Sequence, residues 1–255
     1  MKKYLFTILA LFTIIIQGCD EESTPPPPET PLSVSVLLPL YVYPTEWEND
    51  NELSRLINAA DGQVISIINP DNGPSDSQNS DYVNGIDYLY SKNSKIIAYV
   101  YTLYGARDKQ EIYDDIDKYV DFYGTEKLTG VFFDEVSLNN DANQTYIKDI
   151  SDYAKSKNLN YITLNPGTTI DQSIMDEDYY DLIVTYENPY ENYVDFENPM
   201  HSSTKSKQSL LVYNYPDLDS YKDEIKKAKD MKFDYVYLTT DTESNPWDTV
   251  FNFIK

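Results

Sequence analysis

The chain has 255 residues and a formal net charge of -23 at pH 7, from 43 acidic and 20 basic side chains. Such an acidic surface repels nucleic acid and anionic lipid, so we expect no nucleic-acid partner. It attracts polycations, for example a polymer with free amino groups, although acidity also serves simply to keep a secreted protein soluble. The one cysteine, Cys19, excludes an internal disulfide, so a hydrophobic core must hold the fold together.

The N-terminal segment has the pattern of an export signal followed by a tether. A basic start and an apolar run from Tyr4 to Ile16, too short to span a bilayer comfortably, predict that residues 1–18 are a signal peptide. Cys19 stands where a lipoprotein signal places its lipidated residue; a stray thiol in an ordinary signal peptide is the alternative. Residues 19–31 are mostly acids and prolines, which predicts an extended tether.

These features predict a bacterial lipoprotein that contacts the membrane through its lipid anchor alone. Asp20, Glu21 and Glu22, directly after the cysteine, resemble the surface-export signal of Bacteroidetes lipoproteins. We therefore expect an outer-membrane or cell-surface location. Residues 32–255 fit one monomeric domain, because no second linker of biased composition interrupts them.

Eight apolar segments alternate with polar stretches along this domain. They are rich in Val, Ile, Leu and Tyr and lie at residues 34–42, 63–69, 95–101, 129–134, 161–165, 181–186, 209–214 and 235–239. The polar stretches have helical spacing, as in residues 111–122, where apolar side chains recur at steps of three and four. Eight strand–helix pairs in about 224 residues predict an α/β fold, a (β/α)8 TIM barrel. An open doubly wound sheet is the alternative, but no glycine-rich turn after the first segment suggests a nucleotide site.

In such a barrel, the carboxyl ends of the strands and the loops after them form the active face. Here those positions carry the carboxylates Asp134, Glu135 and Glu187 and the amides Asn69 and Asn165. The tyrosines at these positions are Tyr41, Tyr43, Tyr101, Tyr104, Tyr186 and Tyr213. The absence of histidine, cysteine and lysine there excludes Ser-His and Cys-His nucleophile pairs, a histidine-held zinc and a Schiff-base lysine.

The remaining chemistry is that of carboxylates. Two acids that flank a glycosidic bond suffice to hydrolyse it, one protonating the leaving oxygen while the other attacks or activates water. Sugars also suit the tyrosines, because the C–H face of a pyranose lies flat on an aromatic ring. Each acid has a simpler alternative, a turn or helix cap for Asp134 and a solvated loop position for Glu135 and Glu187.

Two questions about these carboxylates stay open at the level of sequence. Neighbouring residues of a strand point to opposite faces, so Asp134 and Glu135 both enter one site only if the strand ends or bulges there. A divalent metal held by Asp134, Glu135 and Glu187 is the competing chemical interpretation, since hard oxygen ligands suit magnesium or calcium. We favour carboxylate chemistry that uses no metal and no cofactor.

Six segments, in order along the domain, resemble the spherulin-4 family. They lie at residues 37–44, 67–74, 98–107, 130–135, 165–167 and 185–187, and include Gly-Val-Phe-Phe-Asp-Glu and Asn-Pro-Gly. The resemblance implies a (β/α)8 barrel of glycoside hydrolase family 135, which hydrolyses α-1,4-linked, galactosamine-containing exopolysaccharide internally. It implies Asp134, Glu135 and Glu187 as catalytic residues. It places Asn69, Tyr101, Tyr104, Arg107 and Asn165 in matching segments as sugar contacts.

The expected function is therefore that of a surface-tethered endo-glycosidase whose partner is a polysaccharide from the cell surface or a biofilm matrix. Glu135 as the acid and Glu187 as its partner is one assignment of roles. Arg107 either orients a carboxylate on the rim or forms an ordinary ion pair with a helix acid such as Asp114 or Asp115. The alternative function is that of a sugar-binding surface lipoprotein that performs no chemistry.

Overall fold

The structure, a computed structural model, describes residues 35–47, 51–60, 63–200, 203, 205–216, 220–242 and 244–249. The predicted signal peptide, the lipidation site at Cys19 and the predicted tether lie outside the described residues. Within the described part of the chain, no helix is both long and apolar enough to cross a membrane.

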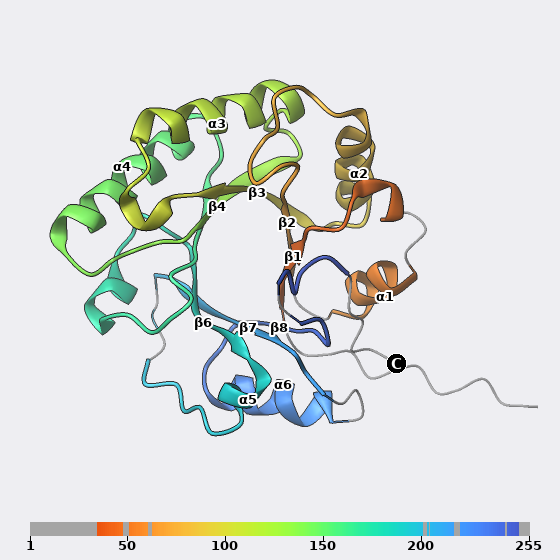
Figure 1. The fold of residues 1–255 in the computed structure, drawn as a ribbon, viewed down its shortest axis with the longest axis vertical. Coiled ribbons are helices and arrows are strands. Elements are labelled where there is room, and N and C mark those ends of the chain that lie inside the picture. Colours follow the sequence, from red (N-terminus) through yellow and green to blue (C-terminus); the bar gives the residue numbers. More distant parts are fainter. Residues whose placement is uncertain are drawn as a thin grey trace, which may run out of the picture. The chain divides into compact units, whose positions relative to one another are not determined.

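Eight parallel strands form one sheet whose spatial order is the order of the sequence. They are β1 (Val36–Leu40), β2 (Val64–Ile68), β3 (Lys95–Tyr101), β4 (Leu128–Asp134), β5 (Tyr161–Leu164), β6 (Leu182–Pro189), β7 (Lys207–Tyr213) and β8 (Tyr235–Leu238). The two ends of the sheet meet where Ser35 forms a parallel bridge with Tyr235 and accepts a hydrogen bond from the Val236 N–H at 3.0 Å. The sheet is therefore a nearly closed barrel, as predicted (Figure 1).

Helices follow most of the strands and lie around the outside of the barrel (Figure 1). They are α1 (Asn51–Ala59), α2 (Ser80–Ser91), α3 (Lys109–Tyr123), α4 (Asp141–Ser156), α5 (Tyr190–Tyr193) and α6 (Tyr221–Asp230). The expectation of a full helix after every strand is wrong for the β5–β6 connection, which carries only the 3-10 helix Gln172–Asp176. Pro166 and the left-handed Gly167, with φ 64°, begin this connection with a loop and leave little length for a helix.

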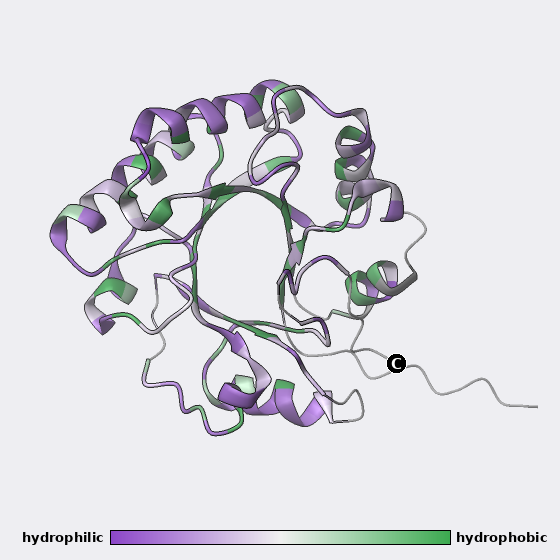
Figure 2. Cartoon of the chain, in the orientation of Figure 1, coloured by the Kyte–Doolittle hydropathy of each residue, from purple (hydrophilic) through white to green (hydrophobic). Residues whose placement is uncertain are grey.

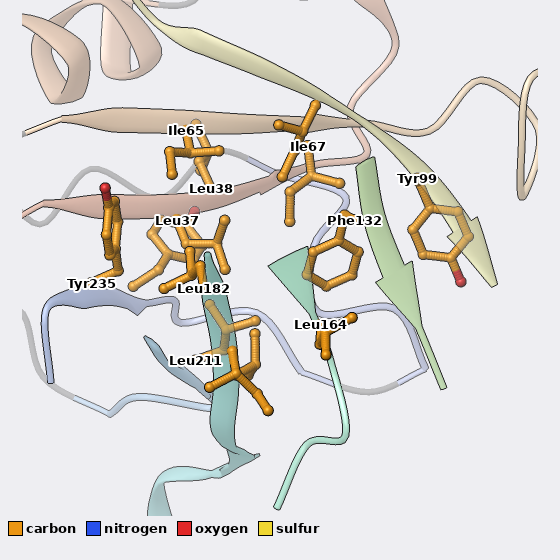
Figure 3. Close-up of a cluster of buried hydrophobic side chains, with 14 of the residues drawn as sticks. Leu37, Leu38, Ile65, Ile67, Tyr99, Phe132, Leu164, Leu182, Leu211 and Tyr235 are labelled. Atoms are coloured by element: carbon orange, nitrogen blue, oxygen red, sulfur yellow. The ribbon is translucent and has the colours of Figure 1, made fainter. Parts of the chain in front are cut away.

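The strands are apolar on both faces because one face fills the barrel and the other contacts the helices. Figure 2 shows mainly hydrophobic strands and helices whose outward faces are hydrophilic. Ile65, Phe132 and Leu182, from three different strands, are buried in the cluster that Figure 3 shows. Helix α3 illustrates the outer layer, since it buries Ile112 and Ile116.

Gly130 in β4 is packed against the neighbouring strand so closely that no side chain fits. A Cβ atom built at this position would lie 1.9 Å from the backbone oxygen of Tyr161. We expect Gly130→Ala to lower the free energy of unfolding by about 3 kcal/mol or more, because two paired strands must separate. Gly124→Ala is the matched control, because a Cβ atom at this position would meet no atom within 4 Å. Only its left-handed φ of 70° should then lower the free energy of unfolding, by about 1 kcal/mol. Urea unfolding of both variants measures the difference; equal losses would contradict the steric explanation.

Candidate active site

Two carboxylates from different strands share one amide group at the carboxyl end of the barrel. The Nδ2 of Asn165, directly after β5, donates to Asp134 Oδ1 at 2.8 Å and to Glu187 Oε2 at 2.7 Å. The distance between the two acceptor oxygens therefore cannot exceed the sum of these two hydrogen-bond lengths. Asp134 ends β4 and Glu187 lies in β6. Asn165 follows β5, the strand between them, and its amide bridges the two acids.

The orientation of the Asn165 amide is set by the glycine that follows it in the loop. Asn165 Oδ1 accepts a hydrogen bond from the Gly167 N–H at 2.9 Å. Because this backbone donor requires the amide oxygen, the NH2 group must face the two carboxylates. Gly167 also accepts the Glu187 N–H through its carbonyl oxygen at 3.2 Å, so one loop residue positions both the amide and the second acid.

A β-bulge turns Glu187 toward the barrel. The pairing of β6 with β7 shifts register between Val184 and Tyr186, which leaves Thr185 as an extra residue. Thr185 donates to Gln208 at 3.1 Å, and Tyr186 packs on Phe196 with ring centroids 4.2 Å apart. Two consecutive side chains thus face outward, and the side chain after them faces inward.

Glu135 lies beside Asp134 because the chain changes direction at this residue. Its φ is 52°, in the left-handed region that residues other than glycine rarely adopt. The conformation is held by its own carbonyl oxygen, which accepts from the Tyr104 N–H and from Thr102 Oγ1, both at 2.7 Å. Strain of this kind concentrates at functional sites. The strand ends at Asp134, so both adjacent acids reach one rim.

Burial raises the pKa of all three acids, and the charge of Asp134 adds to the effect at Glu135 and Glu187. Burial, and then the charge of Asp134, raises the pKa of Glu187 to about 7, against the opposing hydrogen bonds from Asn165 and Trp247. Burial also raises the pKa of Asp134, although three hydrogen bonds favour its charged form. Burial and the charge of Asp134 raise the pKa of Glu135. At neutral pH, Glu187 is thus poised between its two protonation states.

Aromatic residues surround the acids, and two of them were missed by sequence reasoning. Tyr99 donates its hydroxyl to Asp134 Oδ2 at 2.7 Å, and its ring meets that of Tyr41 edge-on with centroids 5.7 Å apart. The side chain of Trp247 donates a hydrogen bond to Glu187. Tyr99 looks in sequence like a core strand residue, and Trp247 lies after the last strand, so neither position carried a signal.

Of the other predicted residues, Tyr41 and Tyr104 lie close to the acids. Burial raises the pKa of Tyr41 well above its ordinary value, and the charge of Asp134 adds to the effect. Burial also raises the pKa of Tyr104, followed by the charges of Glu135, Asp134 and Glu187. Tyr104 is 61% exposed, so its ring is available to a ligand beside the carboxylates.

Two predicted tyrosines are placed away from the acids. Tyr43 bonds Asp81 through its hydroxyl at 2.8 Å, toward helix α2. Tyr186 is buried on the outer face of the sheet, against Phe196. Tyr213 meets the ring of Trp247 edge-on, with centroids 6.1 Å apart. Trp247 therefore links Tyr213 to Glu187.

The amide Asn69 and the pair Tyr101 and Arg107 belong to the neighbouring loops. Asn69 Oδ1 accepts the Gly73 N–H at 3.0 Å within its own loop. Arg107 stacks over the Tyr101 ring, 4.2 Å from its centroid, and pairs with Asp115 at 2.6 Å. Arg107 therefore forms the ion pair with a helix acid, and the alternative that it orients a rim carboxylate is wrong.

The arrangement does not suit a divalent cation between the acids. The amide NH2 of Asn165 points two hydrogens at Asp134 and Glu187, where a cation would need oxygen lone pairs. Within the described residues, no group of three or more His, Cys, Asp and Glu side chains is placed to hold a metal ion. The two carboxylates therefore form a hydrogen-bonded acid pair.

The pKa of Glu187 predicts a pH-dependent stability. The folded pKa of about 7 lies above the ordinary value of 4.5, so the folded state binds the proton more tightly than the unfolded state. Proton binding at Glu187 therefore contributes on the order of 3 kcal/mol to the free energy of unfolding. This contribution is fully present below about pH 4.5 and is lost as the pH rises through about 7. We expect Glu187→Gln to abolish this loss, measured by urea unfolding between pH 4 and pH 8. The exposed Glu197→Gln should keep it; a parallel pH dependence in all three proteins would refute the assignment.

The comparisons with known proteins agree with this architecture. The family model Spherulin4, described as spherulation-specific family 4, matches residues 35–255. The chain belongs to this family. Spherulin-4 of Physarum polycephalum is 36% identical over 148 residues, which cover 56% of this chain and 42% of that protein. The chain thus spans less than half the length of this family member.

A solved structure shows the same fold. The crystal structure of Aspergillus clavatus Sph3 in complex with GalNAc superposes with a TM-score of 0.71 and 22% sequence identity. The match covers 86% of this chain and 93% of that one. The chain therefore shares its barrel fold with Sph3.

Proposed function

We propose that the protein is a glycoside hydrolase that cuts a galactosamine-containing exopolysaccharide internally. The observation that carries the proposal is the half-buried pair of Asp134 and Glu187, joined by the Asn165 amide. Glycosidases need two carboxyl groups close together, one to protonate the leaving oxygen and one to act as nucleophile or base, and this pair supplies two such groups. The GalNAc bound to Sph3, which shares the fold, supports a sugar of the galactosamine type.

The environments of the acids assign their roles. Glu187, whose pKa is raised to about 7, is the general acid that protonates the leaving oxygen. Asp134 receives hydrogen bonds from Tyr99 and Asn165 that favour its anion, so it is the nucleophile. This replaces the assignment of Glu135 as the acid. Glu135 has one buried oxygen, Oε2, without a hydrogen-bond partner, and it binds a polar group of the substrate.

The separation of the pair indicates the stereochemical course. Retaining glycosidases hold their carboxyl groups about 5 to 5.5 Å apart, and inverting enzymes hold them about 6.5 to 9.5 Å apart. One oxygen of Asp134 and one of Glu187 accept from the same nitrogen, at 2.8 and 2.7 Å, and this close approach favours the shorter class. Asp134 attacks the anomeric carbon as Glu187 protonates the leaving oxygen. Glu187 then takes a proton from the water that releases the sugar.

The chain's acidity and its predicted export signal suggest the charge of the substrate and the place where the protein acts. The net charge of -23 would attract a polymer in which part of the amino groups is free and protonated. A lipid on Cys19 and the acidic, proline-rich segment after it would hold the barrel at the outer surface of a bacterial cell. The protein would act there, as a monomer, on a matrix or surface polysaccharide.

The test is hydrolysis of α-1,4-linked galactosamine polymers of graded N-acetylation by the purified protein, with chitosan as the comparison polymer. Mass spectrometry of the products should show oligosaccharides of several lengths, as expected for internal cleavage. Proton NMR during the first turnovers should show the α-anomer, because retention preserves the configuration. Binding of these polymers without any product would instead establish the non-catalytic sugar-binding lipoprotein.

A further inference from the structure

A pocket lies beside the end of strand β3, the strand that pairs with β4 and its terminal Asp134. It has a volume of about 220 Å³ and lies between the β2–α2 loop and helix α3. Residues 71–76 form one wall, Asp115 and Lys118 of α3 form another, and Tyr101 and Arg107 lie on the side of β3. Its size suits a single sugar ring rather than a larger ligand.

The pocket is next to the catalytic acids through strand β3. Tyr101 is the last residue of β3 and lies in register with Asp134 on β4. The following residue, Thr102, donates its N–H to the Asp134 carbonyl oxygen at 2.9 Å. A polymer that crosses the carboxyl end of the barrel through the acid pair can therefore reach the pocket with a neighbouring sugar.

The buried arginine of the pocket is already neutralised. Arg107, with 10% of its side chain exposed, pairs with Asp115 at 2.6 Å and with Glu111 at 3.4 Å. The remaining nitrogen of Arg107, Nη1, donates to the Tyr101 carbonyl oxygen at 3.1 Å. Each of the three nitrogens has a partner and two of the partners are carboxylates, so the charge of Arg107 is balanced within the wall of the pocket.

The remaining charges leave one carboxylate available. Lys118 and Asp76 face each other at 3.8 Å and offset one another. Asp71 is exposed, and within the described residues its carboxylate forms no hydrogen bond and no ion pair. The pocket therefore has an excess of one negative charge, at Asp71, and favours a cation over an anion.

The wall that carries Asp71 is held in shape. The Gly73 N–H donates to Asn69 Oδ1 at 3.0 Å, and the Asp71 N–H donates to the Gly73 carbonyl oxygen at 3.1 Å. Asn72 and Ser75 have left-handed backbones, with φ of 48° and 65°. The loop is thus a defined turn, so a ligand meets a preformed surface and pays little for ordering it.

We propose that this pocket binds one sugar residue of the polymer whose 2-amino group is free, with the protonated amine paired to Asp71. The assignment rests on the proposed function, since it places a second unit of the same polysaccharide beside the site of cleavage. It makes the enzyme selective for chains in which a deacetylated unit lies near the cut bond.

Calorimetric binding to the Glu187→Gln protein tests the pocket without turnover. The probes are galactosamine oligosaccharides, fully deacetylated or fully N-acetylated, each as a disaccharide and as a chain long enough to pass the acid pair. Adding Asp71→Asn should weaken binding of the long deacetylated chain about fivefold, the effect of one exposed ion pair. Binding of the acetylated chain and of the disaccharides should not change.

Asp121→Asn is the matched control, because it removes the same charge from an exposed position of α3 outside the pocket. Equal effects of Asp71→Asn and Asp121→Asn, or no effect of Asp71→Asn, would overturn the proposal. If the wild-type protein binds the long chain in an Asp71-dependent manner but cleaves nothing, the pocket stands and the hydrolase function fails. If the wild-type protein cleaves the polymer and Asp71→Asn changes neither binding nor cleavage, the hydrolase function is supported and the proposed pocket is refuted. Absence of binding by every oligosaccharide removes both.

Discussion

Glu187→Gln is expected to reduce kcat by about 10³-fold or more. Gln has the shape of Glu but no transferable proton, so the leaving oxygen departs unprotonated. The partly buried hydrogen bond from Asn165 at 2.7 Å can still be accepted by the amide oxygen, and the fold should persist. The measurement is the initial rate of oligosaccharide release, with circular dichroism to verify the fold.

Two comparisons make this result specific. Glu135→Gln should lower kcat/KM by a smaller factor, because Glu135 binds substrate but does not transfer the proton in the proposed mechanism. The exposed Glu197→Gln should leave both constants unchanged. If Glu135→Gln were instead the more damaging substitution, the general acid would be Glu135 and the roles proposed for the pair would be wrong.

Asn165→Asp is expected to reduce kcat at pH 7 by about 10²-fold or more, although it changes only one group. The Asp oxygen still accepts the Gly167 N–H, so the loop is kept. The two N–H donors to Asp134 and Glu187 are lost, and a third negative charge enters their space. Repulsion then raises the pKa of each acid, so Asp134 is protonated when it should attack.

The pH profile of Asn165→Asp separates this electrostatic effect from a loss of structure. At lower pH the new carboxyl group is protonated and regains one donor, which should shift the optimum to lower pH and restore part of the activity. The exposed Asn160→Asp is the control and should keep the wild-type profile. A uniform loss of activity at every pH would show that Asn165 only supports the fold.

The strands could be predicted because their signal is local. Most of the eight segments are apolar on both faces over four or more residues, a pattern that a buried parallel strand produces without reference to the rest of the chain. The β5–β6 connection was not predictable in the same way. Its polar residues allow a helix, and the loop begun by Pro166 and Gly167 decided otherwise.

The acids at the strand ends could also be predicted, because Asp134 and Glu187 each interrupt an apolar run. Their relation to each other could not. In an unbroken β6, Glu187 would alternate to the face opposite Val184, and only the bulge at Thr185 returns it to the barrel. A bulge arises from pairing with β7, which a single strand sequence does not contain.

The sequence by itself determined the alternation of strands and helices and the residue types at the strand ends, among them carboxylates, amides and tyrosines, because these depend on residue type and short-range order. Tertiary structure alone decided which groups work together. It brought Tyr99 from within β3, Asn165 from the end of β5 and Trp247 from the segment after β8 onto the acid pair, and it paired Arg107 with Asp115. Hydrogen bonds and pKa values depend on distances of a few ångströms, and closure of the barrel sets those distances between residues far apart in the chain.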